Sequence, residues 1–406
     1  MTEWTQRKVS DLIDGLRAGV SVRSSPGVND GPAVLKTSAI KSGRFDPSEA
    51  KTILKADLQR AKCPVSANSL IISRMNTPAL VGDVGYVEED REDLYLPDRL
   101  WLARKKRNSD TDMRWLTYHF SSEPGSRELR DLATGTSGSM KNIPKNKVLD
   151  LVILTPSPLE QQAIADALAD ADQLISSLER LISKKRAIKQ GMMQELLTGH
   201  TRLRGFTSKW KSKDVGELCV SIRGGGTPSK TVADYWGGQI PWATVKDLSN
   251  FNPKGTIDHI SDSGVAESAA RLVPAGRLIV SVRMLIARAV QFSVDVAINQ
   301  DLKVLNLIPE VNPTFLRYWF NLHEGTFARA AGGSTVSGIS TTELSSKIVN
   351  LPSLEEQTSI AHVLRDVDEE LNALMRRLQS ARDVKEGMMQ ELLTGRTRLL
   401  NKETSK

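Results

Sequence analysis

The sequence predicts an α/β protein in which two mixed α/β domains are separated by two long helices that pair antiparallel as a coiled coil, with pseudo-two-fold symmetry. The first observation is an internal repeat, because GMMQELLTG occurs at residues 191–199 and again at 387–395. The second is that the similarity continues upstream without a gap, at the constant spacing that separates Gly191 from Gly387. The third is that the regions before the two copies differ widely. This alternation indicates a duplicated fold with diverged surfaces.

The first domain is predicted over residues 1–155. It opens near a tryptophan, Trp4, and contains an apolar stretch at residues 70–72 that is typical of a buried strand and ends at Ser73 and Arg74. A polar, glycine-rich segment at residues 134–142 then predicts a loop before the first long helix.

The first long helix is predicted over residues 156–203. Pro156-Ser157-Pro158 is a typical helix start, and Gly199 is a typical helix end. The apolar stripe is too narrow for a full globular core, so we expect the matching stripe of the second copy to cover it. The apolar positions of the first helix alternate at four- and three-residue spacing, as in a coiled coil: Ile164, Leu168, Ala171, Ile175, Leu178 and Ile182.

The second half of the chain repeats this order, with a domain over residues 204–351, a helix over 352–399 and a tail over 400–406. Trp210 takes the place of Trp4, and the apolar strand at 278–282 again ends in a basic residue, Arg283. The alternative interpretation of the two seams is a pair of unrelated helices, each packed on its own domain. The second seam consists of Ile360, Leu364, Val367, Leu371, Leu374 and Leu378.

The composition favours a polyanionic partner and argues against several classes of protein. The 406 residues carry a formal net charge of +7, and the pI is near 9.3. No apolar run approaches the roughly 20 residues of a membrane span, and the first residues lack the apolar core of a signal peptide. Cys63 and Cys219 are far apart, which suits a reducing compartment. We therefore expect a cytoplasmic protein without a structural zinc site.

No arrangement of residues predicts catalysis by this chain. The segment GGGTPSKT at residues 224–231 resembles a phosphate-binding loop, but Ser229 precedes its lysine and Pro228 lacks a backbone donor. We interpret this segment as a flexible loop that can approach a DNA phosphate. The five histidines lack metal-ligand spacing, and no cofactor fingerprint occurs. We expect no catalytic residue, metal or cofactor here; a single-chain nuclease or methyltransferase is the enzymatic alternative.

Basic and amide side chains predict a DNA-binding surface. The basic run RKKR at 104–107 is expected to contact phosphates, although a solvated face is the alternative. Arginine and amide side chains can also contact base edges. Arg74 and Arg283 follow equivalent strands of the two domains, so a structural role is the alternative for this pair. The predicted residues of the first domain are Lys36, Lys41, Arg74, Asn76, Arg104, Lys105, Lys106, Arg107, Ser137 and Lys141. Those of the second domain are Arg223, Lys230, Lys246, Arg283, Arg288, Asn299, Gln300 and Ser334.

The helical repeats also carry a resemblance to a known family. Each helix opens on Pro-Ser-x-x-Glu-Gln and closes on Met-Met-Gln-Glu-Leu-Leu-Thr-Gly. The variable domains contain SRM at residues 73–75 and INQDL at 298–302. With the alternating order of segments, these motifs resemble the specificity subunit of type I restriction-modification enzymes over nearly the whole chain.

The resemblance implies a non-catalytic subunit in a bacterial or archaeal cytoplasm. Each variable domain would be a target recognition domain for one half of a split site in double-stranded DNA. The helices would set the half-site spacing and bind two modification subunits, which methylate adenine with S-adenosylmethionine. Two restriction subunits, with ATP and Mg²⁺, would complete an endonuclease. The alternative function is a scaffold for protein partners without sequence-specific DNA binding.

The repeated helix ends are predicted to dock the partner. Two identical tails that meet two copies of one partner would be under the same constraint, while the DNA-facing domains diverge. The predicted partner-binding residues are Met192, Met193, Leu196, Leu197, Met388, Met389, Leu392 and Leu393.

Overall fold

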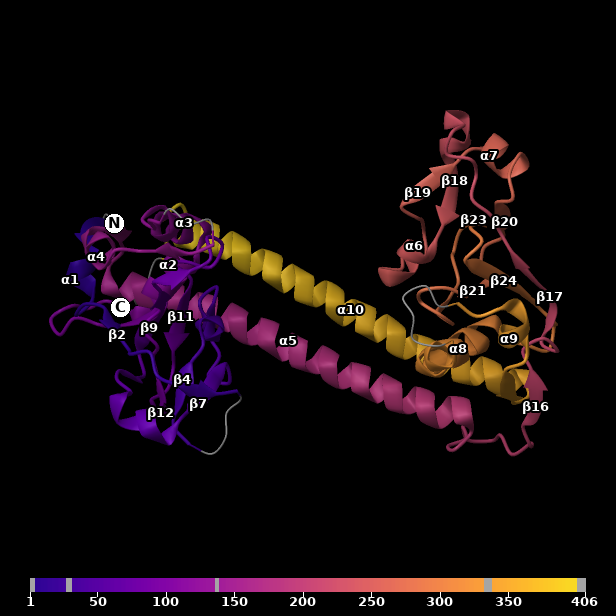
Figure 1. Ribbon diagram of the computed structural model, residues 1–406, viewed down its shortest axis with the longest axis horizontal. Coiled ribbons are helices and arrows are strands. Elements are labelled where there is room, and N and C mark those ends of the chain that lie inside the picture. Colours follow the sequence, from indigo (N-terminus) through magenta and orange to yellow (C-terminus); the bar gives the residue numbers. More distant parts are fainter. Residues whose placement is uncertain (1–3, 27–30, 136–138, 332–337, 400–406) are drawn as a thin grey trace, which may run out of the picture. The chain divides into compact units, whose positions relative to one another are not determined.

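The computed structural model describes residues 4–26, 31–135, 139–331 and 338–399. The chain divides into two compact units: unit 1 is Met1–Glu179 with Arg376–Lys406, and unit 2 is Arg180–Met375. The two long helices are α5 (Pro158–Thr198) and α10 (Leu354–Leu392) (Figure 1). The beginning of α5 and the end of α10 therefore belong to unit 1, and their other parts belong to unit 2.

Unit 1 contains the first variable domain. Its shorter helices are α1 (Val9–Leu12), α2 (Met113–Ser121), α3 (Glu123–Asp131) and α4 (Lys145–Asp150). Its strands are β1 (Thr5–Lys8), β2 (Arg17–Ala18), β3 (Ser24–Ser25), β4 (Ala33–Leu35), β5 (Ile40–Lys41), β6 (Arg44–Phe45), β7 (Ala50–Ile53), β8 (Pro64–Val65), β9 (Ser69–Ser73), β10 (Met75–Asn76), β11 (Val84–Val87), β12 (Arg91–Tyr95), β13 (Leu100–Arg104), β14 (Lys141–Asn142) and β15 (Val152–Thr155).

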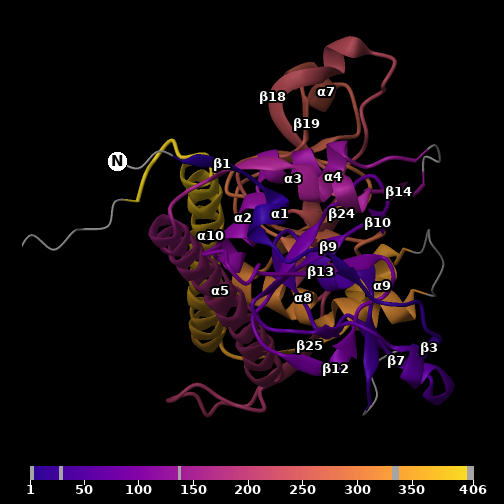
Figure 2. The ribbon, with the colours of Figure 1, turned by 90° about the vertical axis from the view of Figure 1, so that its left-hand side faces the viewer.

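Two sheets form the body of this domain (Figure 2). One has the order β11-β9-β13-β2, and the other has the order β3-β7-β4-β12-β8 with β4 and β12 parallel. All five residues of β9 are buried, in agreement with the apolar run at its centre, residues 70–72. The smaller pairs are β1 with β15, β5 with β6 and β10 with β14.

Unit 2 contains the second variable domain. Its shorter helices are α6 (Val245–Ser249), α7 (Asp262–Ala266), α8 (Pro313–Ala330) and α9 (Thr341–Ser345). Its strands are β16 (Lys211–Asp214), β17 (Cys219–Gly224), β18 (Trp236–Ala243), β19 (Asp258–Ile260), β20 (Arg271–Val273), β21 (Leu278–Ser281), β22 (Ala289–Val290), β23 (Val296–Ile298), β24 (Leu302–Leu307) and β25 (Ile348–Leu351).

The sheets of the second domain repeat the topology of the first. The order β22-β21-β24-β17 corresponds to β11-β9-β13-β2, and β19-β18-β23-β20 corresponds to β7-β4-β12-β8. The pair β18 and β23 is parallel, as β4 and β12 are, and β16 with β25 repeats β1 with β15. The duplicated fold that the sequence predicts is thus confirmed for these sheets, while among the described residues β3 and the pairs β5 with β6 and β10 with β14 occur only in the first domain.

Both long helices begin and end in the same way. Ser157 Oγ accepts from the backbone N–H of Glu160, and Ser353 Oγ accepts from that of Glu356, each at 3.3 Å. Each helix is followed by a glycine with positive φ, which is 76° at Gly199 and 71° at Gly395. None of the helices among the described residues is long and apolar enough to cross a membrane.

Ion pairs show that α5 and α10 run antiparallel within each unit. In unit 1, Lys385 pairs with Asp172 at 2.8 Å and Arg382 pairs with Glu179 at 2.6 Å, so the residue numbers rise along one helix and fall along the other. In unit 2 the pairs are Lys185 with Glu370 at 2.8 Å and Lys189 with Asp368 at 2.6 Å.

The apolar seam has two roles along its length. Its first positions, Ile164 and Leu168, belong to the core of unit 1, and Ile360 and Leu364 belong to the core of unit 2. Farther along the seam, Ile175, Leu178, Ile182 and Leu371 are also buried, although they do not belong to either domain core. The beginning of each helix therefore packs on its own domain, which the alternative interpretation expected for the whole helix.

Candidate nucleic-acid interface

A buried glutamate near the start of each long helix joins that helix to its domain and to the segment that follows the other long helix. In unit 1, Glu160 accepts two hydrogen bonds from Arg398, at 2.5 and 2.6 Å, and one from Trp4 Nε1 at 3.2 Å. In unit 2, Glu356 is only 1% exposed on its side chain. It accepts from Arg202 and Trp210 in the same arrangement, at 2.5, 2.7 and 3.2 Å. The repeated Trp and Glu-Gln motifs therefore build the scaffold.

A second duplicated contact lies on the helix pair. Asp172 accepts from Tyr118 at 2.9 Å and from Lys385 at 2.8 Å. Burial by itself raises the pKa of Asp172, but the hydrogen bond and charge of Lys385 and the hydrogen bonds from Tyr118 and Arg44 together outweigh it, so the net pKa is lowered. Burial, followed by the Asp172 charge, raises the pKa of Tyr118. The equivalent set in unit 2 is Asp368, Tyr318 and Lys189.

Several predicted residues of the second domain lie at one edge of its central sheet, the end at which β21 stops and β24 begins. Ser281, the last residue of β21, pairs with Leu302, the first residue of β24. The residues that follow β21 and those that precede β24 therefore lie at the same edge. Arg283 and Asp301 form an ion pair there, at 3.6 Å.

The glycine-rich segment 224–231 crosses this same edge. The N–H of Gly225 donates to Asn299 O at 3.2 Å, and Thr227 Oγ1 donates to Gln300 Oε1 at 2.8 Å. A Cβ at Gly225 would lie 1.8 Å from Ile298 O, so only glycine fits. In the first domain, a Cβ on Gly19 would meet Leu96 O at 1.6 Å. Both domains thus bring this loop equally close to the strand behind it.

Two tryptophans hold the loop in place, in contrast to the flexible loop that the sequence suggested. Trp242 Nε1 donates to Gly226 O at 3.3 Å, and Trp236 Nε1 donates to Ser229 O at 3.1 Å. Their rings meet edge to face, with centroids 5.1 Å apart. The loop is therefore a fixed wall beside the sheet edge.

A hollow of about 600 Å³ opens beside this loop. Lys230 and Lys246 line it, and both side chains are exposed. Neither lysine forms an ion pair within the part of the chain that the structure describes, so both can bind an anion. Asn299 also lines the hollow but is 5% exposed and its amide is engaged with Asp301, so its predicted base contact is revised to a structural role.

The equivalent edge of the first domain gathers a second group. Arg74 follows β9, stacks on Trp101 with 5.4 Å to the ring centroid, and donates to Asn142 Oδ1 at 3.4 Å. Asn76 and Lys141 pair across β10 and β14. The Asn76 amide is engaged with Ser73 and Thr77, and Lys141 Nζ donates to the Gly135 carbonyl at 2.7 Å.

The basic run at residues 104–107 lies at the opposite edge of the same sheet. Arg104 pairs with Ser69, at the far end of β9 from Arg74, and β9 spans roughly 16 Å at 3.3 Å per residue. Arg104 donates to Ser66 Oγ at 2.8 Å, and Lys106 donates to Ser10 O at 2.8 Å. The remaining members, Lys105 and Arg107, are exposed. The predicted residues of the first domain therefore do not form one surface.

The other predicted residues that the structure describes do not line the hollow of the second domain. Lys36 follows β4 and pairs with Glu49 at 3.4 Å. Arg288 pairs with Glu324 of α8 at 2.7 Å. Arg223 is exposed on β17. Ser137 and Ser334 fall outside the described residues.

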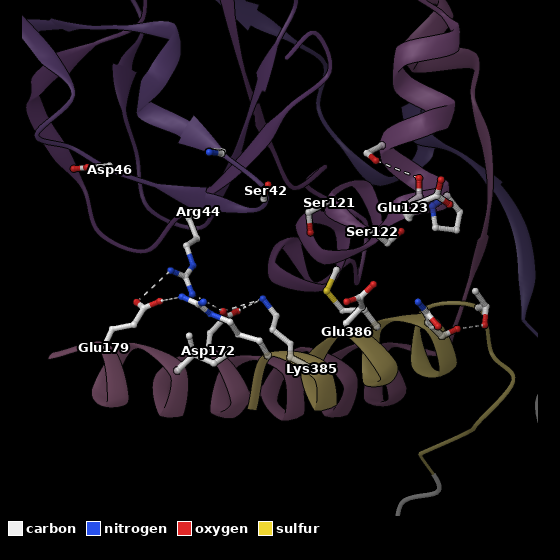
Figure 3. Close-up of a pocket in the computed structure, with 18 of the residues that line it drawn as sticks. Ser42, Arg44, Asp46, Ser121, Ser122, Glu123, Asp172, Glu179, Lys385 and Glu386 are labelled. Atoms are coloured by element: carbon white, nitrogen blue, oxygen red, sulfur yellow. Dashed lines mark hydrogen bonds and ion pairs between the residues drawn. The ribbon is translucent and has the colours of Figure 1, made fainter. Parts of the chain in front are cut away.

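Lys41 lines a different hollow, of about 970 Å³, between the β5–β6 hairpin, the α2–α3 junction and the two long helices (Figure 3). Arg44 of the same hairpin reaches down to Asp172 at 3.2 Å and approaches Glu179 at 4.0 Å. The hairpin thus faces the helices in unit 1. The position of Lys41 favours a contact with DNA at this hollow over one at the sheet edge.

The predicted partner-binding residues lie largely in the protein's own core. Met193, Leu196 and Leu197 are 2–6% exposed and pack in the core of unit 2, and Leu392 and Leu393 pack in the core of unit 1. The partly buried members Met192, Met388 and Met389 pack against the same cores. A side chain buried in this way is not available to a partner, so we revise the docking prediction: core packing explains the identical tails.

Sequence reasoning missed several residues of the second edge. Trp236 and Trp242 fix the loop, Arg271 Nε donates to Gly224 O at 2.9 Å, and Met284 projects beside the hollow with 75% of its side chain exposed. Two tryptophans a few residues after a glycine-rich loop were the available signal. No group of three or more metal-ligating side chains occurs among the described residues.

Comparisons with known proteins find similarity to one family. A family model described as type I restriction modification DNA specificity domain matches residues 207–381. A putative type I restriction enzyme specificity subunit of Methanocaldococcus jannaschii is 22% identical, covering 98% of this chain and 94% of its own. The EcoR124I/EcoR124II specificity subunit of Escherichia coli is 29% identical over 41% of this chain and 42% of its own.

Solved structures share the fold. The S subunit of a type I restriction-modification system from M. genitalium matches with a TM-score of 0.62 and 16% identity, covering 96% of both chains. A second structure, from work on complex assembly and conformational transition of the type I R-M system, matches with a TM-score of 0.60 and 17% identity, covering 97% of this chain and 98% of its own. By the family model and the curated relatives, the chain is similar to the specificity subunits of type I restriction-modification enzymes, and the solved structures show that it shares their fold.

Proposed function

We propose that each variable domain recognises one half of a split site in double-stranded DNA through the edge of its central sheet. The edge consists of Arg74 and Lys141 in the first domain and of Lys230, Lys246 and Arg283 in the second. The observation that supports this proposal most directly is the contrast between matched scaffold contacts and unmatched edges. Lys230 and Lys246 are exposed cations that form no ion pair among the residues that the structure describes, and such cations suit phosphates.

In this proposal the partners are two modification subunits, which hold S-adenosylmethionine and methylate adenine, and two restriction subunits, which use ATP and Mg²⁺. Specificity subunits are non-catalytic, and catalysis lies in the partner subunits. The domains run over residues 1–155 and 204–351, with the spacer helices over 156–203 and 352–399. The helices dock the modification subunits through side chains that remain exposed after the chain has folded.

The first test is sequence-specific binding by the complex with modification subunits. Mapping of methylated adenines in the host genome gives the site, and titration of duplexes that contain or lack it measures the specificity. We expect the target to bind at least about 10³-fold more tightly than unrelated duplexes at physiological salt. Equal affinity for all duplexes would favour the alternative, a protein scaffold without sequence-specific binding.

The second test locates the DNA-binding edge. The double variant Lys230→Ala and Lys246→Ala should weaken binding and reduce the slope of log K against log salt by about 2, because two phosphate contacts are lost. Lys105→Ala with Lys106→Ala is the matched control, since it removes the same charge from the opposite edge of a sheet. An unchanged slope in the first variant and a reduced slope in the control would place DNA at the basic run instead.

A further inference from the structure

The hollow of the second domain offers few free hydrogen-bonding groups to a ligand, although several polar side chains line it. The indole N–H groups of Trp236 and Trp242 donate to the loop carbonyls. Thr227 donates to Gln300, and Thr244 donates to Asp247 Oδ2 at 3.1 Å. The amide of Asn299 is engaged with Asp301. What a ligand meets is therefore mainly apolar surface, with charges at the rim.

The apolar surface consists of the two tryptophans, Val245 and Met284, and the charged groups are Lys230, Lys246, Asp258 and Asp301. Asp301 is already paired with Arg283, at 3.6 Å. Met284 is 75% exposed, which is unusual for a large apolar side chain. Two lysines beside an apolar hollow suit a polyanion that carries an apolar projection.

The backbone holds Met284 in this position. Its φ is +59°, in the left-handed region that is unfavourable for a residue with a side chain. The turn is fixed on both sides, because Ala287 N donates to Ser281 O at 2.8 Å and Val282 N donates to Asp301 O at 2.9 Å. Ile339 N in turn donates to Val282 O at 2.9 Å. The exposed methionine is thus a built feature of the edge.

We propose that this hollow receives the C5-methyl group of a thymine in the second domain's half-site, with Met284 as the residue that selects it. The inference rests on the proposed function. The thymine methyl is the apolar group that the base edges present in the major groove, and the other edges present donors and acceptors. Lys230 and Lys246 then bind the flanking phosphates.

The test uses the complex of the full chain with modification subunits and a duplex that contains its mapped target. Each thymine of the second domain's half-site, on either strand, is replaced in turn by deoxyuridine, which removes only the methyl group. We expect a loss of about three- to tenfold in affinity at one position, as for burial of one methyl group, and little change elsewhere. Fluorescence anisotropy competition measures each ratio.

Variants assign the effect to the hollow. Met284→Ala should bring the thymine-to-deoxyuridine ratio at that position close to one, and Met284→Leu should preserve it. Met75→Ala is the matched control, because Met75 follows Arg74 in the first domain as Met284 follows Arg283. Asp258→Asn should also leave the ratio unchanged, because a carboxylate reads hydrogen-bond donors such as the cytosine amino group and not a methyl group.

The outcomes separate this inference from the proposed function. Tight, sequence-specific binding with no deoxyuridine effect, or a half-site without thymine, would overturn the methyl contact and leave the proposed function intact. The same holds if Met284→Ala keeps the full ratio. Absence of any sequence-specific binding would instead overturn the proposed function.

Discussion

Units 1 and 2 have the same scaffold and different edges. The Glu160 contact with Arg398 in unit 1 recurs as the Glu356 contact with Arg202 in unit 2. The pairing of β9 with β13 likewise recurs as that of β21 with β24. The residues that hold each domain to the helices are therefore constrained by packing, and the residues at the sheet edges are free to diverge.

The two units differ where the scaffold does not constrain them. Unit 1 has the β5–β6 hairpin, whose Arg44 contacts Asp172 of α5. Tyr118 and Tyr318 occupy equivalent positions, and the residue that follows them is His119 in unit 1 and Trp319 in unit 2. Such differences make the response of each unit to a perturbation distinguishable.

The largest expected effect comes from changing the helices that the two units share. Insertion of seven residues after Glu179 and seven after Met375 keeps the heptad seam and lengthens each helix by about 10 Å. If the helices set the half-site spacing, the preferred gap should grow by about three base pairs, at 3.4 Å per pair. The original site should then lose about 10³-fold in affinity.

Binding to a duplex series with different gaps measures this change. Insertion in α5 alone is the control, because it moves one seam against the other and should weaken binding at every gap. An unchanged preferred gap in the double insertion would mean that the helices do not set the spacing.

The next effect tests whether the repeated tails serve the core. Leu197→Ala in unit 2 and Leu393→Ala in unit 1 should each lower the free energy of unfolding of the chain without partners by about 2–5 kcal/mol, because each leaves a cavity in a packed core. Hydrogen exchange should assign each loss to its own unit. Gln194→Ala, an exposed position of the same repeat, is the control. Unchanged stability together with weaker partner binding would restore the docking interpretation.

The smallest effect is a pH dependence confined to unit 1. Burial lowers the pKa of His119 to about 4, and neither ring nitrogen has a hydrogen-bond partner among the described residues. The unfolded chain binds this proton below about pH 6.5, so stability falls as the pH is lowered from 6.5 to 4, by up to about 3 kcal/mol. Hydrogen exchange of residues 113–121 measures the fall.

His119→Phe should remove this part of the acid sensitivity, because phenylalanine has no group to titrate. Residues 313–330 of unit 2, with Trp319, serve as the internal control. An equal fall in both units, or one that persists in the variant, would show that His119 is not its source.

The sequence predicted the fold because its signals are local or repeated. The heptad spacing, the helix-start prolines and serines, and Gly199 act within a few residues and are found where expected. The tertiary edges depend on register, which no local pattern encodes. The separation of Arg74 from Arg104 follows only from the pairing of Ser69 with Arg104.

The site was predicted in residue type more than in arrangement. Lys230 and Lys246 meet at one hollow as basic residues of a common surface. Asn299 has the right chemistry for a base edge but bonds within the chain, and Met284 has no hydrogen-bonding chemistry to attract notice. The repeated leucines of the tails suggested a partner because identity in sequence does not distinguish a core contact from an interface.

The division of the helices also bears on how the chain folds during synthesis. Unit 2 is one continuous segment, Arg180–Met375, so all of its core is available once that segment has left the ribosome. The core of unit 1 includes Leu392 and Leu393, which are made about 200 residues after its first domain. The domain that is translated first is therefore completed last. Part of its core surface stays exposed until the end of α10 has been made and packs on it, which closes a loop as long as unit 2.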